Sequence, residues 1–374
     1  MKNSKFINVY YNNIHAGVLA KTQNGLIAFE YSDEFIQSGF SISPLSLPLI
    51  KKVYLPEDYF TFQGLFGVFN DSLPDGWGRL IVDRYLSSKG INLQKVSLLD
   101  RLAIISDYGM GALEYKPEYE VIEFDNSSYD LDKLSSDCAN LFEDKPVDNI
   151  DELFNMAGSS GGARPKVLVS YNNEQWIIKF AGRNDISESG IMEYDYNVAA
   201  KECGIEVPEH KLFSSNICQG YFGVKRFDRL SGKKIHMVSA CGLLETSHRI
   251  PNLDYNILMK LTFKITNSME EVKKMYRLMV FNVLAHNRDD HGKNFSYIYD
   301  DTEKRYKFSP AYDLTYSFSI NNEHATTVNG KGRDISIDDM LDVAKKSDID
   351  IMFAKNVIKD IQERTQALKK YDSH

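Results

Sequence analysis

The stretch His286–Asn294 reads HNRDDHGKN, and it follows a segment whose apolar residues repeat at helical spacing. Val272, Met275, Met279 and Val283 form that apolar stripe, which predicts a helix with one buried face. The change from a regular apolar stripe to a run of charged, amide and imidazole side chains predicts that the helix ends at an exposed loop.

Arg288-Asp289 and the later Asn294 have the spacing R-D-x-x-x-x-N of a protein-kinase catalytic loop. In such loops the Asp accepts the proton of the acceptor hydroxyl and the Asn holds a magnesium ion, which prefers oxygen ligands. A charged loop without chemistry is one alternative. A second is a zinc or iron site, although no H-E-x-x-H pattern supports it. Its ligands would be His286, Asp289, Asp290 and His291.

A glycine-rich stretch, MAGSSGGARPK, occupies residues 156–166 and contains a G-x-S-x-G match centred on Ser160. A nucleophile elbow needs a strand before its serine and a helix after it. Here helical spacing precedes the serine, while Pro165 and a Val-Leu-Val run follow, so the context argues against acyl transfer. No G-K-[ST] follows at Walker A spacing. Backbone N–H groups beside the glycines could instead bind phosphate, and a mobile surface loop is the alternative.

Three further residues extend the pattern in both directions. Lys179 ends a predicted strand thirteen residues after Lys166, and Glu193 begins the next predicted helix fourteen residues later. Asp313, in SPAYDL, follows Asn294 by nineteen residues. In kinases a strand lysine contacts the α- and β-phosphates, a helix glutamate orients it, and a late aspartate is the second magnesium ligand. The order along the chain is therefore that of a two-lobed kinase.

The remaining pattern predicts an α+β chain. Alternation and Asn-Gly turns predict strands in residues 1–60, a helix follows over 77–88, and acidic residues 124–152 read as a connection. A hairpin over 167–180 and a helix over 190–203, ended by Gly204, come next. We therefore expect a bilobal protein-kinase-like fold with a β-rich N-terminal subdomain and an all-helical C-terminal lobe. Its expected domains are 1–125, 126–228 and 229–374.

Composition narrows the class of protein. The chain has 374 residues and a net charge of -8, from 44 basic and 52 acidic residues, which argues against a surface built throughout for nucleic acid. Its four cysteines lack a C-x-x-C pair, so a zinc knuckle or disulfide framework is not indicated. The start of the sequence lacks a signal-peptide pattern, and no apolar run is long enough to span a bilayer. We expect a cytoplasmic protein without membrane contact.

With these motifs in place, the chain resembles the HipA family, the serine/threonine-kinase toxins of bacterial HipBA toxin–antitoxin systems. The resemblance runs from about residue 5 to 345 and includes the N-terminal unit of full-length members. It rests on FNDSLPDGWGRL (69–80), DYGMGALEY (107–115), GGARPK (161–166), VKRFDR (224–229), RDDHGKNFS (288–296) and SPAYDL (309–314).

The resemblance implies a role for each matching position. Asp289 would be the catalytic base, and Asn294 and Asp313 would bind magnesium. Lys179 would hold the ATP phosphates, with Glu193 as its structural partner. Further nucleotide contacts would come from Gly161, Gly162, Ala163, Arg164, Lys166, Lys225, Phe227, Asp228, His291, Lys293 and Tyr312.

Two of these regions have open questions. Residues 225–227 would be the hinge that reads adenine, although Lys225 stands where the best-known member has an acid. Asp228 would reach the ribose hydroxyls, and the alternative is a surface ion pair with Arg226 or Arg229. In the family a serine of the glycine-rich loop is autophosphorylated, after which the loop leaves and ATP binding is lost. Ser159 or Ser160 would take that phosphate.

The resemblance also implies partners and rivals. We expect ATP and magnesium as cofactors, a protein substrate such as an aminoacyl-tRNA synthetase or translation factor, and a HipB-like helix-turn-helix antitoxin. Operator DNA would be contacted only through the antitoxin complex. One rival is a small-molecule kinase of the aminoglycoside-kinase type, which shares the Asp-x-x-x-x-Asn loop. The other is a catalytically silent kinase fold that acts with the antitoxin on DNA.

Overall fold

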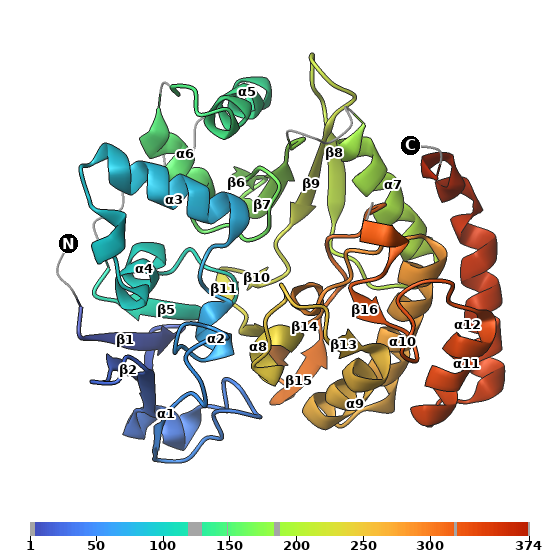
Figure 1. Ribbon diagram of the computed structural model, residues 1–374, viewed down its shortest axis with the longest axis horizontal. Coiled ribbons are helices and arrows are strands. Elements are labelled where there is room, and N and C mark those ends of the chain that lie inside the picture. The colour runs from blue at the N-terminus through green and yellow to red at the C-terminus, as the bar shows by residue number, and fades with distance from the viewer. Residues whose placement is uncertain (1–3, 119–128, 148, 183–187, 318–319, 373–374) are drawn as a thin grey trace. The chain divides into compact units, whose positions relative to one another are not determined.

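The computed structural model describes residues 4–118, 129–147, 149–182, 188–317 and 320–372. The chain forms two compact units (Figure 1). The first unit contains residues 1–190, 211–238 and 242–245, and the second contains residues 191–210, 239–241 and 246–374. The expected domain boundary at residues 125–126 lies outside the described residues.

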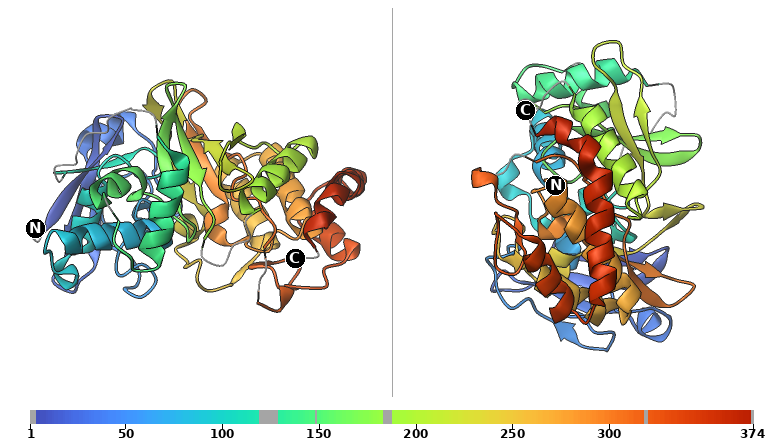
Figure 2. Two further views of the ribbon diagram at one scale, coloured as in Figure 1. Left: turned by 90° about the horizontal axis from the view of Figure 1, so that it is seen from above. Right: turned by 90° about the vertical axis from the view of Figure 1, so that its right-hand side faces the viewer.

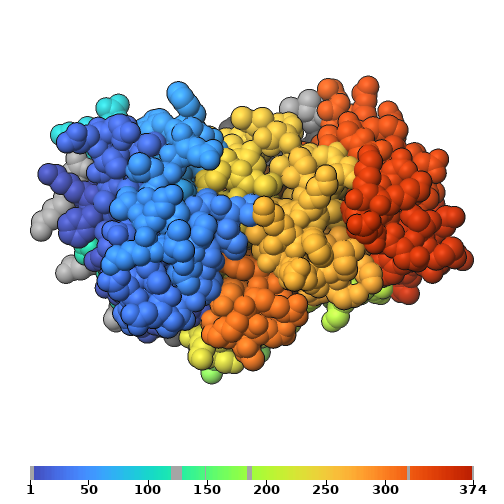
Figure 3. All heavy atoms as spheres, turned by 90° about the horizontal axis from the view of Figure 1, so that it is seen from below, coloured from blue at the N-terminus to red at the C-terminus, as the bar shows by residue number. Residues whose placement is uncertain are grey.

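A five-stranded antiparallel sheet begins the first unit, with strand order β4-β3-β2-β1-β5. Its strands are β1 (Phe6–Tyr11), β2 (Ile14–Lys21), β3 (Ile27–Tyr31), β4 (Val53–Tyr54) and β5 (Leu113–Lys116). Alternate residues of β1 are buried, as the sequence alternation predicted. The short helices α1 (Asp33–Ser38) and α2 (Gly67–Asn70) follow β3 and β4. Figure 3 shows one face of the molecule with residues of this N-terminal part in blue.

A second sheet in the first unit has the order β6-β7-β9-β8. Its strands are β6 (Lys166–Tyr171), β7 (Glu174–Lys179), β8 (His210–Phe213) and β9 (Tyr221–Lys225). The β6–β7 pair confirms the predicted hairpin. Helices α3 (Gly76–Ser88), also predicted, and α6 (Ile150–Ala157) lie side by side and share a buried core with β6 and β7 (Figure 1). In the sequence, η1 (Leu93–Lys95) and α4 (Leu98–Ile105) follow α3.

One segment of the first unit corrects a prediction. Residues 124–152 were expected to be a connection, but their described part contains the helix α5 (Leu131–Phe142) and the start of α6. Leu134, Cys138 and Leu141 are buried on one face of α5. Their i, i+4, i+7 spacing is the signal that the acidic composition concealed. Downstream are the short strands β10 (Arg229–Leu230) and β11 (Lys233–Lys234).

Helices dominate the second unit. They are α7 (Ser189–Glu202), which begins in the first unit, α9 (Tyr255–Thr266), α10 (Met269–Leu284), α11 (Ile337–Lys346) and α12 (Ile351–Arg364), with short η turns at Gly292–Asn294, Ile320–Asn322 and Thr365–Tyr371. The predicted stripe of α10 is buried, and Gly204 has the left-handed backbone expected of the residue after α7. Helices α11 and α12 pack against each other (Figure 2, right).

The second unit is not all-helical as expected. It also contains an antiparallel hairpin of β14 (Ser296–Asp300) and β15 (Arg305–Phe308), and a parallel pair of β13 (Leu253–Asp254) and β16 (Thr326–Thr327). Strand β12 (Met237–Ser239) and helix α8 (Ala240–Leu244) lie where the chain passes between the units in sequence. The α+β class is confirmed. Among the described residues, no helix is both long and apolar enough to cross a bilayer.

Candidate functional site

The glycine-rich loop, residues 158–166, lies in the first unit after α6 and before β6. Ser160 follows a helix and precedes a strand, as the sequence predicted. A nucleophile elbow has the reverse order, with a strand before the serine and a helix after it. The Ser160 hydroxyl donates to the carbonyl of Ala157 at 2.6 Å, and the side chain is buried. Ser159 is only half-buried and lines a small hollow beside Phe154. The two candidate serines therefore differ in accessibility.

The loop is held by the start of α3, a contact that the sequence did not predict. The Asp75 carboxylate accepts the N–H of Gly162, and the N–H of Trp77 donates to the Gly162 carbonyl at 2.9 Å. The Trp77 indole also donates to the carbonyl of Lys166 at 3.0 Å. A Cβ on Gly78 would lie 2.0 Å from the Ser160 carbonyl oxygen. Two glycines at the start of a helix were the available signal, because they lower helix stability unless backbones must approach closely.

Positive charge gathers at the C-terminal end of the loop. Lys166 and Lys179 are paired residues across the β6–β7 ladder. The Lys166 ammonium donates to the Gly161 carbonyl at 2.6 Å, while that of Lys179 lies 5.7 Å from the centre of the Phe222 ring. Two positively charged side chains thus occupy opposed positions of the β6–β7 ladder where the loop meets the sheet. Arg164 is half-buried, and Ala163 is exposed.

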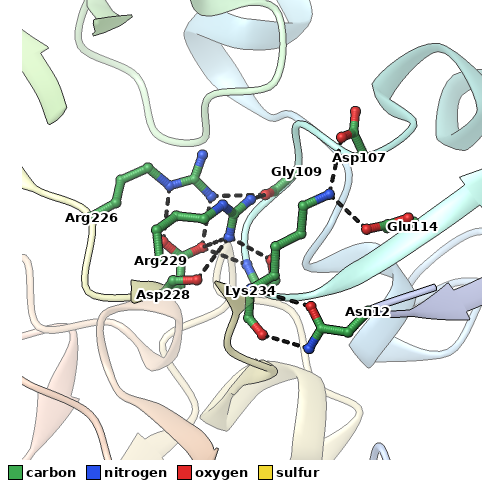
Figure 4. A network of polar contacts seen from close by, with 9 residues as sticks. Asn12, Asp107, Gly109, Glu114, Arg226, Asp228, Arg229 and Lys234 are labelled. Carbon is green, nitrogen blue, oxygen red and sulfur yellow. Dashed lines mark hydrogen bonds and ion pairs between the residues drawn. The ribbon is translucent and has the colours of Figure 1, made fainter. Parts of the chain in front are cut away.

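The predicted hinge, residues 225–227, ends β9 and leads to Asp228. Lys225 forms an ion pair with Glu174 at 2.5 Å, and Phe227 is half-buried. Asp228 is 1% exposed, and its carboxylate accepts from Arg226 at 2.7 Å and Arg229 at 2.9 Å (Figure 4). Asp228 thus pairs with both arginines of the alternative, although the pair is buried and not on the surface. Its ribose contact stays a prediction.

The Asp228 ion triad, formed with Arg226 and Arg229, joins distant parts of the first unit. The Gly111 N–H donates to Asp228 at 2.7 Å, and both guanidinium groups donate to the Gly109 carbonyl (Figure 4). Burial alone raises the pKa of Asp228, but the two arginines lower it to about 2. In this arrangement Asp228 contributes to the frame of the first unit.

A second group of contacts extends this frame. The Lys234 ammonium lies 3.0 Å from Asp107 and 2.8 Å from Glu114 (Figure 4). The Asn12 amide exchanges hydrogen bonds with the backbone of Lys234. Strands β1 and β5 of the N-terminal sheet are thereby connected to the segment after the predicted hinge.

In the second unit the catalytic-loop motif forms the turn after α10. The Asn294 amide nitrogen donates to the Asp289 carbonyl oxygen at 2.7 Å, so the two predicted functional residues lie together. The Asp289 side chain is 62% exposed, and its carboxylate lies 3.8 Å from Nε2 of His291. An exposed carboxylate on a fixed backbone can meet an incoming hydroxyl group.

Tyr312 links this loop to the late aspartate. Its hydroxyl donates to the Lys293 carbonyl and contacts the Ser296 hydroxyl at 2.6 Å. Asp313, the next residue, is half-buried and has a left-handed backbone with φ of 55°. The bond between Tyr312 and Lys293 therefore brings the second predicted magnesium ligand toward the loop that bears the first.

The four side chains of the transition-metal alternative have different partners in the structure. Over the described residues, no three histidine, cysteine, aspartate or glutamate side chains are grouped so as to hold a metal ion. His286 pairs with Asp372 at 2.9 Å, whereas Asp290 accepts from Tyr255 and His324. The carboxylates and imidazoles of the motif therefore bind different partners and do not converge on one point.

Glu193 lies in α7 within the second unit and is 4% exposed, while Lys179 lies in the first unit. Their pairing stays a prediction. The sequence also missed the roles of Asn287 and Asp290, which lie beside Arg288-Asp289 in the loop and are buried. A polar residue buried within a charged loop has no local sequence signal, because its partners come from elsewhere in the chain.

The fold of each unit and the order of these parts along the chain define a kinase-like α+β protein. More particularly, the chain belongs to the HipA family. The family model of the HipA-like C-terminal domain matches residues 158–369, and that of the HipA N-terminal domain matches residues 7–116.

Two similar proteins are named as putative kinases. The chain is 26% identical to "Putative kinase Y4dM" of Sinorhizobium fredii over 213 residues, which cover 52% of this chain and 51% of that protein. It is 26% identical to "Putative kinase Y4mE" of the same organism over 351 residues, 83% of this chain and 77% of that protein. The chain thus spans about half the length of the first relative.

A solved structure resembles the fold over nearly the whole chain. It is HipA of Shewanella oneidensis MR-1, from a complex of HipA, HipB and operator DNA of a toxin–antitoxin system. The TM-score is 0.71 at 18% identity, with 97% of this chain and 90% of that chain covered. At this identity the likeness concerns the fold.

Proposed function

We propose that this chain is an ATP- and magnesium-dependent kinase that phosphorylates serine or threonine hydroxyl groups of a protein. The observation that carries the proposal is the exposed Asp289 carboxylate, on a backbone that the Asn294 side chain holds. Family membership and the names of the two Sinorhizobium relatives support it.

The proposed chemistry is transfer of the γ-phosphoryl group. Asp289 orients the acceptor hydroxyl and accepts its proton, a bond forms between that oxygen and the γ-phosphorus, and the bond to the β,γ-bridging oxygen breaks to release ADP. Positioning and charge neutralisation supply most of the catalysis in such reactions.

The residues present suit magnesium. The Asn294 nitrogen is used by the Asp289 carbonyl, which leaves the amide oxygen of Asn294 as the atom that would bind a cation. The Asp313 carboxylate would be the second ligand. When bound, the ion would neutralise negative charge on the phosphates.

The first unit would contribute phosphate contacts. Lys166 and Lys179 would supply positive charge for a triphosphate. Further donors would be loop N–H groups other than those of Gly158, Ser160 and Gly162, which already donate to Phe154, Ala157 and Asp75. His291, Lys293 and Tyr312 of the second unit, and Lys225 and Phe227 of the first, would complete the nucleotide contacts.

We assign self-phosphorylation to Ser159. Its side chain is half-buried beside a hollow, whereas Ser160 is buried and its hydroxyl is bonded to Ala157. The proposed partners are a translation-related protein substrate and a HipB-like antitoxin. The solved relative was found with HipB and operator DNA, and we propose that this chain meets DNA only through such an antitoxin.

The test compares the purified wild-type chain with Asp289→Asn, using γ-labelled ATP, magnesium and a nucleotide-depleted bacterial extract as acceptor. We expect labelled phosphoserine or phosphothreonine with the wild type and at least about a 1000-fold lower rate with the variant. Asp338→Asn, which changes an exposed carboxylate at the start of α11, is the matched control and should label normally. Equal labelling by Asp289→Asn would refute the proposal.

A further inference from the structure

Asp290, next to the proposed catalytic base, lies at the centre of a buried hydrogen-bond network in the second unit. It is 1% exposed. One carboxylate oxygen accepts from the Tyr255 hydroxyl at 2.8 Å and from Nδ1 of His324 at 3.0 Å. The other accepts from the N–H of Thr326 at 3.2 Å. Because a carboxylate only accepts, His324 carries its proton on Nδ1.

The network also reaches the other side of Asp289. The buried Asn287 side chain donates to that of Asn282 at 2.9 Å, and Asn282 donates to the Tyr255 hydroxyl at 2.9 Å. Tyr255 in turn donates to Asp290. Both residues that flank Arg288-Asp289 are thus attached to one buried network, while the Asp289 side chain itself is exposed.

Backbone contacts fix the same loop against residues 324–327. The Thr326 hydroxyl donates to the Asp290 carbonyl at 2.5 Å, and the N–H of Ala325 donates to the Arg288 carbonyl at 3.1 Å. Strand β16, which includes Thr326, pairs in parallel with β13. The loop is therefore attached to regular structure through Asp290.

We propose that Asp290 and His324 are positioning residues for phosphoryl transfer, which hold the backbone of Asp289 so that its exposed carboxylate meets the acceptor hydroxyl. This inference rests on the proposed function. It concerns the rate of transfer and not ATP affinity, because the network contacts the loop from its buried side.

The chemistry of the site explains why a carboxylate is needed. Three donors converge on Asp290: a hydroxyl, an imidazole N–H and a backbone N–H. In Asp290→Asn the amide nitrogen replaces one acceptor, so at least one buried donor loses its partner. The loop must then shift to reach another acceptor or water.

The experiment measures the limiting transfer rate and the half-saturating ATP concentration for four variants. In Asp290→Asn and His324→Leu we expect the limiting rate to fall about 100-fold, as a misplacement of about 1 Å can cause. The half-saturating ATP concentration should change less than about 2-fold, since the lost interaction acts in the transition state. His324→Asn, whose amide nitrogen can replace Nδ1, should recover most of the rate.

Asp339→Asn is the matched control. Asp339 is also buried and also accepts from a hydroxyl and an N–H, but it caps α11 with Ser336. This variant should lose thermal stability and keep its transfer rate. Circular dichroism and calorimetric ATP binding for each variant would separate misfolding from misplacement, and His324→Leu decides the matter if Asp290→Asn does not fold.

The outcomes separate the two proposals. If Asp289→Asn transfers phosphate normally, the proposed function is wrong. If transfer depends on Asp289 but folded Asp290→Asn or His324→Leu keeps the wild-type rate, the positioning role is wrong. Equal rate losses in His324→Asn and His324→Leu, or in Asp339→Asn, would also overturn it.

Discussion

Asp228 in the first unit and Asp290 in the second are buried to the same extent, at 1% exposure, but their partners differ in charge. Asp228 lies between two guanidinium groups and also accepts one backbone N–H. Asp290 accepts from a tyrosine hydroxyl, a histidine ring and a backbone N–H. Each directly follows a proposed site residue, Phe227 or Asp289.

The difference indicates different tasks. The Asp228 ion triad connects Gly109 and Gly111 with residues 226–229, more than a hundred positions away in sequence, and so closes the frame of the first unit. The Asp290 network holds one short loop in place. Removing one partner of a buried ion pair gives the larger loss of stability, whereas directional hydrogen bonds from a hydroxyl, an imidazole and an amide set the geometry of a neighbouring residue.

The largest expected effect is that of Asp228→Asn. Removing the charge takes away the ion-pair partner of the buried Arg226 and of the mostly buried Arg229, which should cost about 3–5 kcal/mol of unfolding free energy. Urea unfolding of the wild type and the variant measures this value. A loss of unfolding free energy below about 1 kcal/mol would show that the ion triad stabilises the chain no more than a surface ion pair does. Asp228 would then not differ from Asp290 in its contribution to stability.

The same variant predicts a pH dependence. The pKa of Asp228 is lowered from 3.8 to about 2, so its contribution is present above 3.8 and is lost as pH falls through about 2. The difference in stability between wild type and Asp228→Asn should therefore stay constant from neutral pH to about pH 4 and shrink below it. A difference that already shrinks near neutral pH would contradict the ion-triad account.

Glu245, also in the first unit, has a pKa that is shifted in the opposite direction from that of Asp228. Burial raises its pKa from 4.5 to about 7, despite a hydrogen bond from the Gly67 N–H, and the Asp71 carboxylate adds to the rise. Its contribution is thus present below 4.5 and is lost as pH rises through about 7. Glu245→Gln should stabilise the chain by about 2 kcal/mol at about pH 8, after allowance for its partial exposure.

Thermal unfolding near pH 5 and near pH 8 checks the Glu245 prediction. The melting temperature of Glu245→Gln should exceed that of the wild type only near pH 8. If the melting temperatures of the two proteins differ equally near pH 5 and near pH 8, the effect arises from packing and not from the ionised carboxylate.

The smallest expected effect is that of Tyr255→Phe. Loss of the hydroxyl removes one of the three donors to Asp290 and the acceptor of Asn282, which should cost about 1–2 kcal/mol. Differential scanning calorimetry gives the value. A loss as large as that of Asp228→Asn would mean that one hydroxyl donor to Asp290 contributes as much to stability as the charge of Asp228.

Elements with a strong local pattern were predictable. The stripe of α10, the β6–β7 hairpin and the left-handed Gly204 just beyond α7 each follow from a local sequence pattern. Helix α5 was missed because acidic residues dominate its composition, although Leu134, Cys138 and Leu141 have helical spacing. The short strands of the second unit have too few residues for a periodic signal.

For the candidate site, the sequence predicted which motifs occur and in what order, but not most of the contacts between them. The pairing of Asn294 with the Asp289 backbone is local, and it agrees with the spacing of the motif. By contrast, the partners of Asp228 and the contact of Asp75 with Gly162 come from residues far away in sequence, so no window of the sequence contains them. Burial of both Asp228 and Asp290 is likewise a tertiary property.

The contact between the start of α3 and the glycine-rich loop has a consequence for how the chain folds. Trp77 and Gly162 are separated by 84 intervening residues, so the loop gains its native shape only after a long-range closure. Contacts of this separation form late and slowly, because the entropy of loop closure opposes them. Trp77, whose indole donates to Lys166, is a natural fluorescence reporter of that step. We expect its signal to change after most of the helix content has formed.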